Sequence, residues 1–128
     1  PFCDQEQETI NHLLLTCVFS RTVWKEICKA FGRPDWAPTQ HDILAPWLCN
    51  KHGLNGMSIK DLRTILGLTM WELWKHRNAI VFDGAQPSCE VLLRRIRLEG
   101  LVWVSAGLLK GDVSLLFHWL ARWDRREE

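Results

Sequence analysis

The sequence predicts an all-α fold, an irregular helical bundle that forms a single domain over residues 1–128. Apolar residues recur at the helical period through two long stretches, 58–82 and 88–109. Ser58 and Ser88 precede these stretches as N-caps do, and glycines follow them as helix-ending residues do. No segment alternates apolar and polar residues for long enough to predict a strand.

The remaining elements are shorter and less regular. Three prolines and three glycines between Gly32 and Gly56 make 33–57 the least regular part. Pro46 is expected in the first turn of a short helix there. In chain order, helices are expected over about two turns starting near Glu8 or Thr9, then over 20–31, 42–49, 58–82 and 88–109, and finally after Asp112 to about Trp123. The domain thus divides into three parts, 1–17, 18–57 and 58–128.

Charge and cysteine content narrow the class of protein. The formal net charge is +1 at pH 7, too small for a global field that attracts nucleic acid or an anionic membrane. The apolar runs are too short to span a bilayer, and no signal-peptide pattern opens the chain. With five cysteines and no glycosylation sequon, we expect an intracellular protein, in nucleus or cytoplasm, whose thiols are reduced or bind metal. Neither a membrane nor a small-molecule substrate is indicated as a partner.

Three potential zinc ligands stand near the N-terminus. Cys3, His12 and Cys17 are spaced Cys-x8-His-x4-Cys, and thiolate and imidazole are ligands that a structural zinc prefers. A closed site needs four ligands, so this trio is incomplete by itself. Positions five apart on an ideal helix point about 140° apart, so the helix must unwind before Cys17 for both side chains to reach one ion. Cys28 is a conceivable substitute, although a core position beside Trp24 is the simpler interpretation.

Four stretches of the chain also resemble a known family. They are Pro-Phe-Cys-Asp at 1–4, Glu-Thr-Ile-Asn-His-Leu-Leu-Leu-Thr-Cys at 8–17, Phe-Ser-Arg-Thr-Val-Trp at 19–24 and Trp-Glu-Leu-Trp-Lys-His-Arg-Asn-Ala-Ile-Val-Phe at 71–82. Together they closely resemble the zinc-binding region near the C-terminus of reverse-transcriptase polyproteins from plant LINE-like (non-LTR) retroelements. The resemblance covers most of the chain, with 33–57 least matched. It implies zinc on Cys3, His12 and Cys17, a fourth ligand just upstream of Pro1, and RNA or DNA as partner.

The residue before Pro1 separates two hypotheses about function. If it is Cys, the zinc site is complete and the domain is a non-catalytic, zinc-binding accessory module of a retroelement reverse transcriptase that assists RNA or DNA handling. If it is an initiator Met, the site has three protein ligands. The domain is then a host-retained relic that acts as a helical protein–protein interaction domain, with or without zinc.

The sequence contains no complete catalytic apparatus, so we expect no enzyme activity. Reverse transcription and ribonuclease H chemistry need clustered carboxylates that hold metal ions. The aspartates here are scattered, mostly at expected caps and turns. No phosphate-binding loop, nucleophile elbow or His-Glu-x-x-His motif is present. In full-length members of the retroelement family that the chain resembles, the polymerase lies before this region and a ribonuclease H domain often lies after it.

A short basic stripe is the best candidate for contact with phosphates. Residues 1–20 hold three carboxylates and no Lys or Arg, so the zinc segment repels a phosphate backbone. Arg21, Lys25 and Lys29 recur every four residues along the expected 20–31 helix. A solvated helix face is the simpler alternative. Trp71 and Trp74 could offer a stacking surface for bases, but their apolar neighbours favour a place in the core.

One pair of opposite charges falls on apolar stripes. Arg77 shares the stripe of Ile59, Leu66, Met70 and Leu73, and Glu99 shares that of Leu92, Ile96 and Trp103. Either charge alone is costly to bury. The sequence therefore predicts a buried structural ion pair between Arg77 and Glu99 that joins the two long helices.

Overall fold

The computed structural model describes residues 9–54, 56–110, 118 and 120–121, and the fold is all-α, as predicted. Its elements are the π-helix η1 (His12–Thr16), α1 (Val18–Ala30), the 3-10 turn η2 (Pro34–Trp36), α2 (Leu44–Cys49), α3 (Ile59–Asp83) and α4 (Cys89–Ser105). Among the described residues, no helix is both long and apolar enough to cross a membrane. Most of the helix expected near the C-terminus lies outside the described residues.

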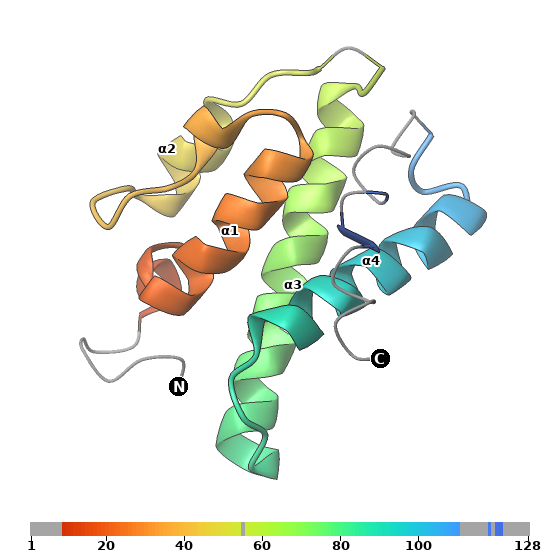
Figure 1. The fold of residues 1–128 in the computed structure, drawn as a ribbon. Coiled ribbons are helices and arrows are strands. Elements are labelled where there is room, and N and C mark those ends of the chain that lie inside the picture. Colours follow the sequence, from red (N-terminus) through yellow and green to blue (C-terminus); the bar gives the residue numbers. More distant parts are fainter. Residues whose placement is uncertain (1–8, 55, 111–117, 119, 122–128) are drawn as a thin grey trace.

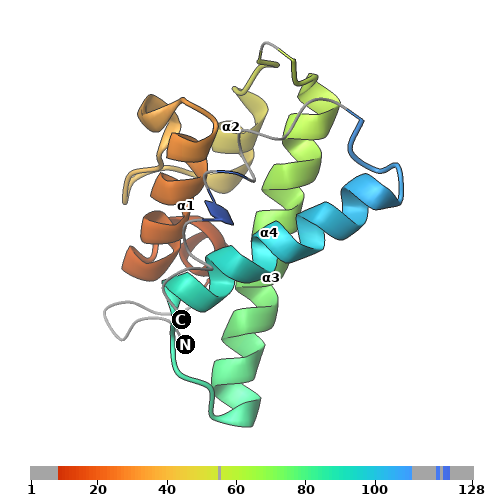
Figure 2. The same ribbon diagram turned by 45° about the vertical axis from the view of Figure 1, so that its right-hand side comes forward.

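The long helix α3 is the axis of the fold (Figure 1). It packs against α4 and η1, while α1 packs against η1, η2 and α4. Figure 2 shows α4 crossing α3 obliquely, and in both views the C-terminal end of α3 projects beyond the other helices. The outer surface of this projecting end is therefore covered by few other elements.

The core lies where α1, α3 and α4 converge. Its fully buried members include Val23, Trp24, Ile27, Leu62, Ile65, Leu66, Leu68, Leu73, Leu92, Leu93 and Ile96. Trp24 meets Trp47 of α2 edge-on, with ring centroids 4.8 Å apart. The Trp24 indole N–H donates to Leu14 O at 2.7 Å, and that of Trp47 donates to Trp36 O at 3.0 Å. These two tryptophans combine apolar burial with a satisfied polar group.

The local signals that begin and end the two long helices act as the sequence predicts. The Ser58 hydroxyl accepts from Asp61 N–H at 3.1 Å, and the Ser88 hydroxyl accepts from Val91 N–H at 3.2 Å. Gly84 ends α3 with a left-handed φ of 70°. The second helix ends at Ser105, earlier than the predicted residue 109, because Gly107 adopts a left-handed φ of 79° and stops it.

The N-terminal helices differ from the prediction in two ways. α1 begins at Val18 because Cys17, with ψ of 145°, breaks the preceding π-helix and takes the N-cap position. Ser20, the expected cap, is buried inside α1 and its hydroxyl donates to Leu13 O. α2 has Pro46 in its first turn, as predicted. Its cap is supplied from elsewhere in the chain, because Leu44 N–H donates to the Asn11 side-chain oxygen at 2.7 Å.

The buried face of α3 is rotated relative to the predicted apolar stripe. Its buried residues outside that stripe are Asp61, Ile65, Leu68, Thr69, Glu72 and His76. Arg77 consequently lies at the edge of the buried face and is only half-buried. The core position expected for two tryptophans is also wrong, since Trp71 is 51% exposed and Trp74 is 38% exposed.

Candidate functional site

The candidate metal segment is organised by η1. Its turn closes with a hydrogen bond from Cys17 N–H to His12 O at 2.8 Å, which spans five residues. A turn of this width places Cys17 one full turn along the chain from His12, whereas an α-helix would point the two side chains about 140° apart. The π-helix is thus an unwinding of the backbone at the place where the His-x4-Cys spacing predicts one.

Both described ligand candidates sit in a buried environment. His12 is 9% exposed and Cys17 is 1% exposed. The Thr16 hydroxyl lies 3.5 Å from His12 Nδ1, and His12 N–H donates to the Thr9 hydroxyl at 3.0 Å. Cys3 lies outside the described residues. Among the described residues, to which Cys3 does not belong, no three His, Cys, Asp or Glu side chains gather as a metal-ion group.

Cys28 does not behave as a replacement ligand. Its side chain is 1% exposed and belongs to the hydrophobic core. Burial raises the pKa of its thiol to about 12, an effect that the charge of nearby Lys51 partly opposes. These properties support the core interpretation.

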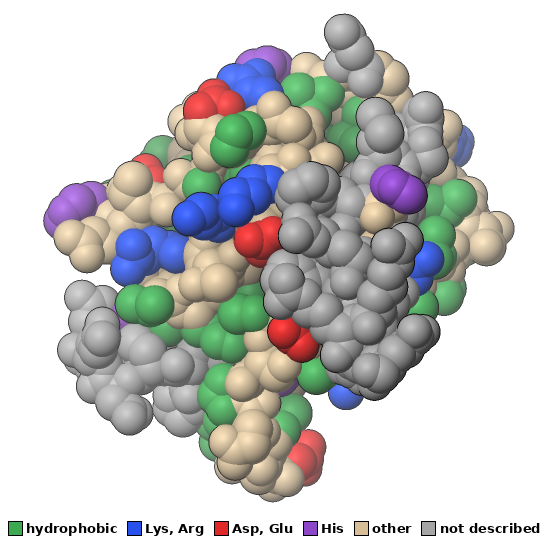
Figure 3. Space-filling model, viewed as in Figure 1, with side chains coloured by type: hydrophobic (Ala, Val, Ile, Leu, Met, Phe, Trp, Pro, Cys, Tyr) green, Lys and Arg blue, Asp and Glu red, His purple; other side chains and the backbone are tan. Residues whose placement is uncertain are grey.

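The predicted basic stripe lies on α1. Arg21 is half-buried and its Nε donates to Thr16 O at 3.0 Å, which ties the end of η1 to α1. Lys25 is exposed, and Lys29 Nζ lies 3.6 Å from the Glu26 carboxylate. Figure 3 shows Lys and Arg side chains gathered on the face that carries α1. The stripe is thus a basic surface with one carboxylate inside it.

The predicted ion pair between Arg77 and Glu99 does not form. Glu99 instead accepts from the Trp103 indole N–H at 3.0 Å. Arg77 Nη1 donates to the Asn78 side-chain oxygen at 3.0 Å, and its guanidinium carbon lies 5.7 Å from the centroid of the Trp74 ring. The rotation of the buried face of α3 explains the difference, because it moves Arg77 away from the centre of the interface with α4.

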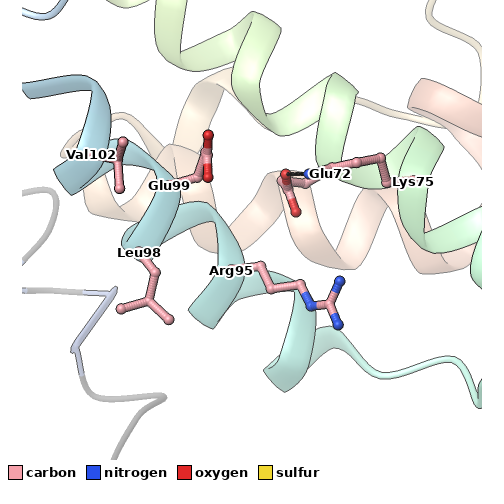
Figure 4. Close-up of a pocket in the computed structure, with 6 residues that line it drawn as sticks. All are labelled: Glu72, Lys75, Arg95, Leu98, Glu99 and Val102. Carbon is pink, nitrogen blue, oxygen red and sulfur yellow. Dashed lines mark ion pairs between the residues drawn. The ribbon is translucent and has the colours of Figure 1, made fainter. Parts of the chain in front are cut away.

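Beside α4, the charge that α3 buries is that of Glu72 rather than that of Arg77. Its side chain is 2% exposed, and its Oε2 lies 2.6 Å from Lys75 Nζ. A pocket of about 280 Å³ between α3 and α4 is lined by Glu72, Lys75, Arg95, Leu98, Glu99 and Val102. In Figure 4 the dashed line joins only Glu72 and Lys75 among these charged side chains. Sequence periodicity missed Glu72 because that residue lies outside the apolar stripe.

Comparisons of this chain with protein-family models, with curated proteins and with solved structures found no match. Function must therefore be inferred from the side chains of the chain itself. Two features of the described residues bear on it most directly: the His12–Cys17 turn and the basic or aromatic surfaces of the helices.

Proposed function

We propose that the chain is a non-catalytic, zinc-binding accessory module of a retroelement reverse transcriptase that helps to hold RNA or DNA. The observation that carries the proposal is the π-turn from His12 to Cys17. π-helices are rare in proteins, and those that occur often lie at functional sites. This one supports the proposal because it unwinds the chain between His12 and Cys17, as a His-x4-Cys ligand pair requires.

The donor set fits a structural zinc ion. Cys3, His12 and Cys17 would hold the metal through two thiolates and one imidazole, and a further ligand would come from upstream of Pro1. When bound, zinc would supply a cross-link between the N-terminal segment and η1. Two hydrogen bonds extend that cross-link into the bundle, since Arg21 holds the end of η1 and Asn11 caps α2.

Three of the described aspartates support a non-catalytic role because they have structural partners. Asp35 pairs with Arg33 at 2.8 Å, and Asp42 accepts from Thr39 N–H at 2.7 Å. Asp61 is buried, where it accepts from Lys110 N–H at 3.3 Å. Carboxylates used in this way are spread across the fold, whereas two-metal chemistry needs them in one cluster.

Metal content tests the zinc half of the proposal. We expect about one zinc ion per chain when the protein, extended by the residues that its transcript encodes before Pro1, is purified without chelator. His12→Ala and Cys17→Ala should each lose the metal and lower the melting temperature. Cys49→Ala is the matched control, because Cys49 is exposed on α2. A metal-free parent protein, or equal loss in the control, would contradict the proposal.

Charge reversal tests the nucleic-acid half. Three phosphate contacts from the α1 stripe predict weak binding to duplex DNA with a log–log salt slope of about −3. Lys25→Glu combined with Lys29→Glu should abolish that binding, measured by fluorescence anisotropy with labelled RNA and DNA at two salt concentrations. Unchanged binding in this variant would remove the stripe from the proposal.

A protein-interaction domain is the second candidate, and the outer surface of α4 favours it. Leu98 is 49% exposed, Leu101 is 38% exposed and Val102 is 57% exposed. Clustered exposed apolar side chains are typical of interaction surfaces. A chain that carries no zinc and melts at the same temperature with and without chelator would favour this candidate over the first.

A further inference from the structure

Two tryptophans near the middle of α3 have exposed side chains. Trp71 is 51% exposed and Trp74 is 38% exposed. By contrast, Trp24 and Trp47 are buried, and their indole N–H groups are bonded to backbone carbonyls. Large exposed indoles are costly to leave in water. Their exposure in neighbouring turns of a well-formed helix therefore calls for a functional explanation.

Cations accompany both exposed rings. Lys75 Nζ lies 5.6 Å from the centroid of the Trp71 ring, and the guanidinium carbon of Arg77 lies 5.7 Å from that of Trp74. Each distance is within cation–π range. Lys75 also contacts the buried Glu72, so its position between carboxylate and ring is held from two sides.

On α3, two carboxylates lie on the buried face and two cations on the exposed face. Its buried carboxylates are Asp61, at 5% exposed, and Glu72, at 2% exposed. Its outward cations include Lys60, in the first turn of the helix, and Arg63, one turn further on, and both are exposed. The exposed carboxylate of α3 is Asp83, at its last residue. The outer face thus presents positive charge, although the net charge of the chain is only +1.

The basic and aromatic residues share one line along the helix. Lys60, Arg63, Gly67, Trp71 and Trp74 follow one another at spacings of three or four, which places them on one face. At the rise of an α-helix, Lys60 and Trp71 are about 16 Å apart. Gly67 lies between the two groups, and a Cβ added there would meet nothing within 4 Å. The surface between the cations and the indoles is therefore open.

We propose that this outer face of α3 binds single-stranded nucleic acid, with unpaired bases stacked on Trp71 and Trp74 and phosphates held by Lys60 and Arg63. Exposed aromatic side chains interleaved with cations are the elements from which sequence-tolerant single-strand sites are built. A protein partner fits this surface less well, since it would have to desolvate the cations as well as cover the indoles. The inference rests on the proposed function for its ligand class, and it does not depend on zinc.

The first experiment separates stacking from charge. The full chain is titrated into a fluorescein-labelled ten-nucleotide oligo-dT, its abasic counterpart and a duplex of equal length at 50 mM salt, with anisotropy as readout. Binding should be at least about tenfold weaker to the abasic strand and to the duplex, because neither offers unpaired bases that can stack on the indoles. Equal affinity for the abasic strand would overturn the proposal, because only the phosphates would then matter.

Substitutions locate the site. Trp71→Ala with Trp74→Ala should weaken oligo-dT binding by about tenfold or more, whereas Trp71→Phe with Trp74→Phe should retain most of it, because phenylalanine also stacks. Lys60→Ala with Arg63→Ala should reduce the salt slope by about 1.4, the value for two single-strand phosphate contacts. Ile43→Ala is the matched control, since Ile43 is a 64%-exposed apolar residue on another segment. Circular dichroism checks that each variant is folded.

The remaining outcomes distinguish this surface from the α1 stripe and from a protein interface. Binding lost in Lys25→Glu with Lys29→Glu but unchanged in the double tryptophan variant would overturn this inference and leave the α1 proposal standing. Binding lost in the tryptophan variant of a zinc-free protein would support this inference while the metal proposal fails. The chain could also fail to bind oligo-dT at 50 mM salt and instead form a dimer that the tryptophan substitutions dissociate. That result would assign the face to self-association and overturn the proposal.

Discussion

The ion pair of Glu72 and Lys75 should respond very differently to the loss of each partner. Glu72 is 2% exposed, whereas the Lys75 side chain is 41% exposed, and the charged atoms lie 2.6 Å apart. Glu72 Oε2 is buried without an aligned hydrogen-bond donor among the described residues. The ammonium of Lys75 is therefore the principal compensation that the structure shows for a carboxylate removed from water.

Lys75→Met should lower the free energy of unfolding by about 2–4 kcal/mol, because the Glu72 carboxylate stays buried and loses that compensation. Glu72→Met should change it by less than about 1 kcal/mol, since Lys75 can turn into water and a methionine fills a similar volume. The double variant should match Glu72→Met, so the second substitution rescues the first.

Urea denaturation followed by circular dichroism measures all four proteins of this cycle. We expect a coupling energy between the two positions of at least about 1 kcal/mol, with the larger loss of stability in Lys75→Met. Equal costs for the two single substitutions, or a double variant as unstable as Lys75→Met, would refute the burial argument. Either result would mean that another group compensates Glu72 in the folded protein.

Two further predictions concern the N-terminal half and pH. Asn11→Ala should lower the free energy of unfolding, measured by urea denaturation, by about 1–2 kcal/mol, because Leu44 N–H loses its capping acceptor. Asn11→Asp should lower it less, because a side-chain oxygen remains. A wild-type midpoint for the alanine variant would count against the cap. Burial, assisted by Arg95, lowers the pKa of His76 below 6.5, and its Nε2 lies 3.1 Å from Ser88 N–H, which can donate to the neutral ring. Because the pKa of His76 is depressed in the folded protein, neutral His76 stabilises the fold above about pH 6.5, and this stability is lost as pH falls through the folded pKa. Urea denaturation between pH 7.5 and 5 should show the loss, and His76→Gln should make the free energy of unfolding depend less on pH.

Features that depend on a few adjacent residues could be read from the sequence. Ser58 and Ser88 cap their helices because a serine hydroxyl reaches the N–H three residues ahead. Pro46 lies in the first turn of α2 because a first turn has no need for its missing N–H. The conflict in the His12-x4-Cys17 spacing was also visible, since it follows from the rise and twist of one helix. The sequence did not indicate that a π-turn would lie between these two residues, because the π-turn depends on the backbone hydrogen bond from Cys17 N–H to His12 O.

By itself, the sequence determined the helical class, the principal turns and the candidate ligands Cys3, His12 and Cys17, because propensity, capping and residue chemistry act over short distances. Tertiary packing decided the rotation of α3, and with it the burial of Glu72 in place of Arg77 and the exposure of Trp71 and Trp74. When a helix has apolar residues on several sides, its own sequence does not define one buried face, and packing against the neighbouring helices decides which side is buried. The capping of α2 at Leu44 by Asn11, 33 residues earlier in the chain, likewise exists only once the two segments have packed together.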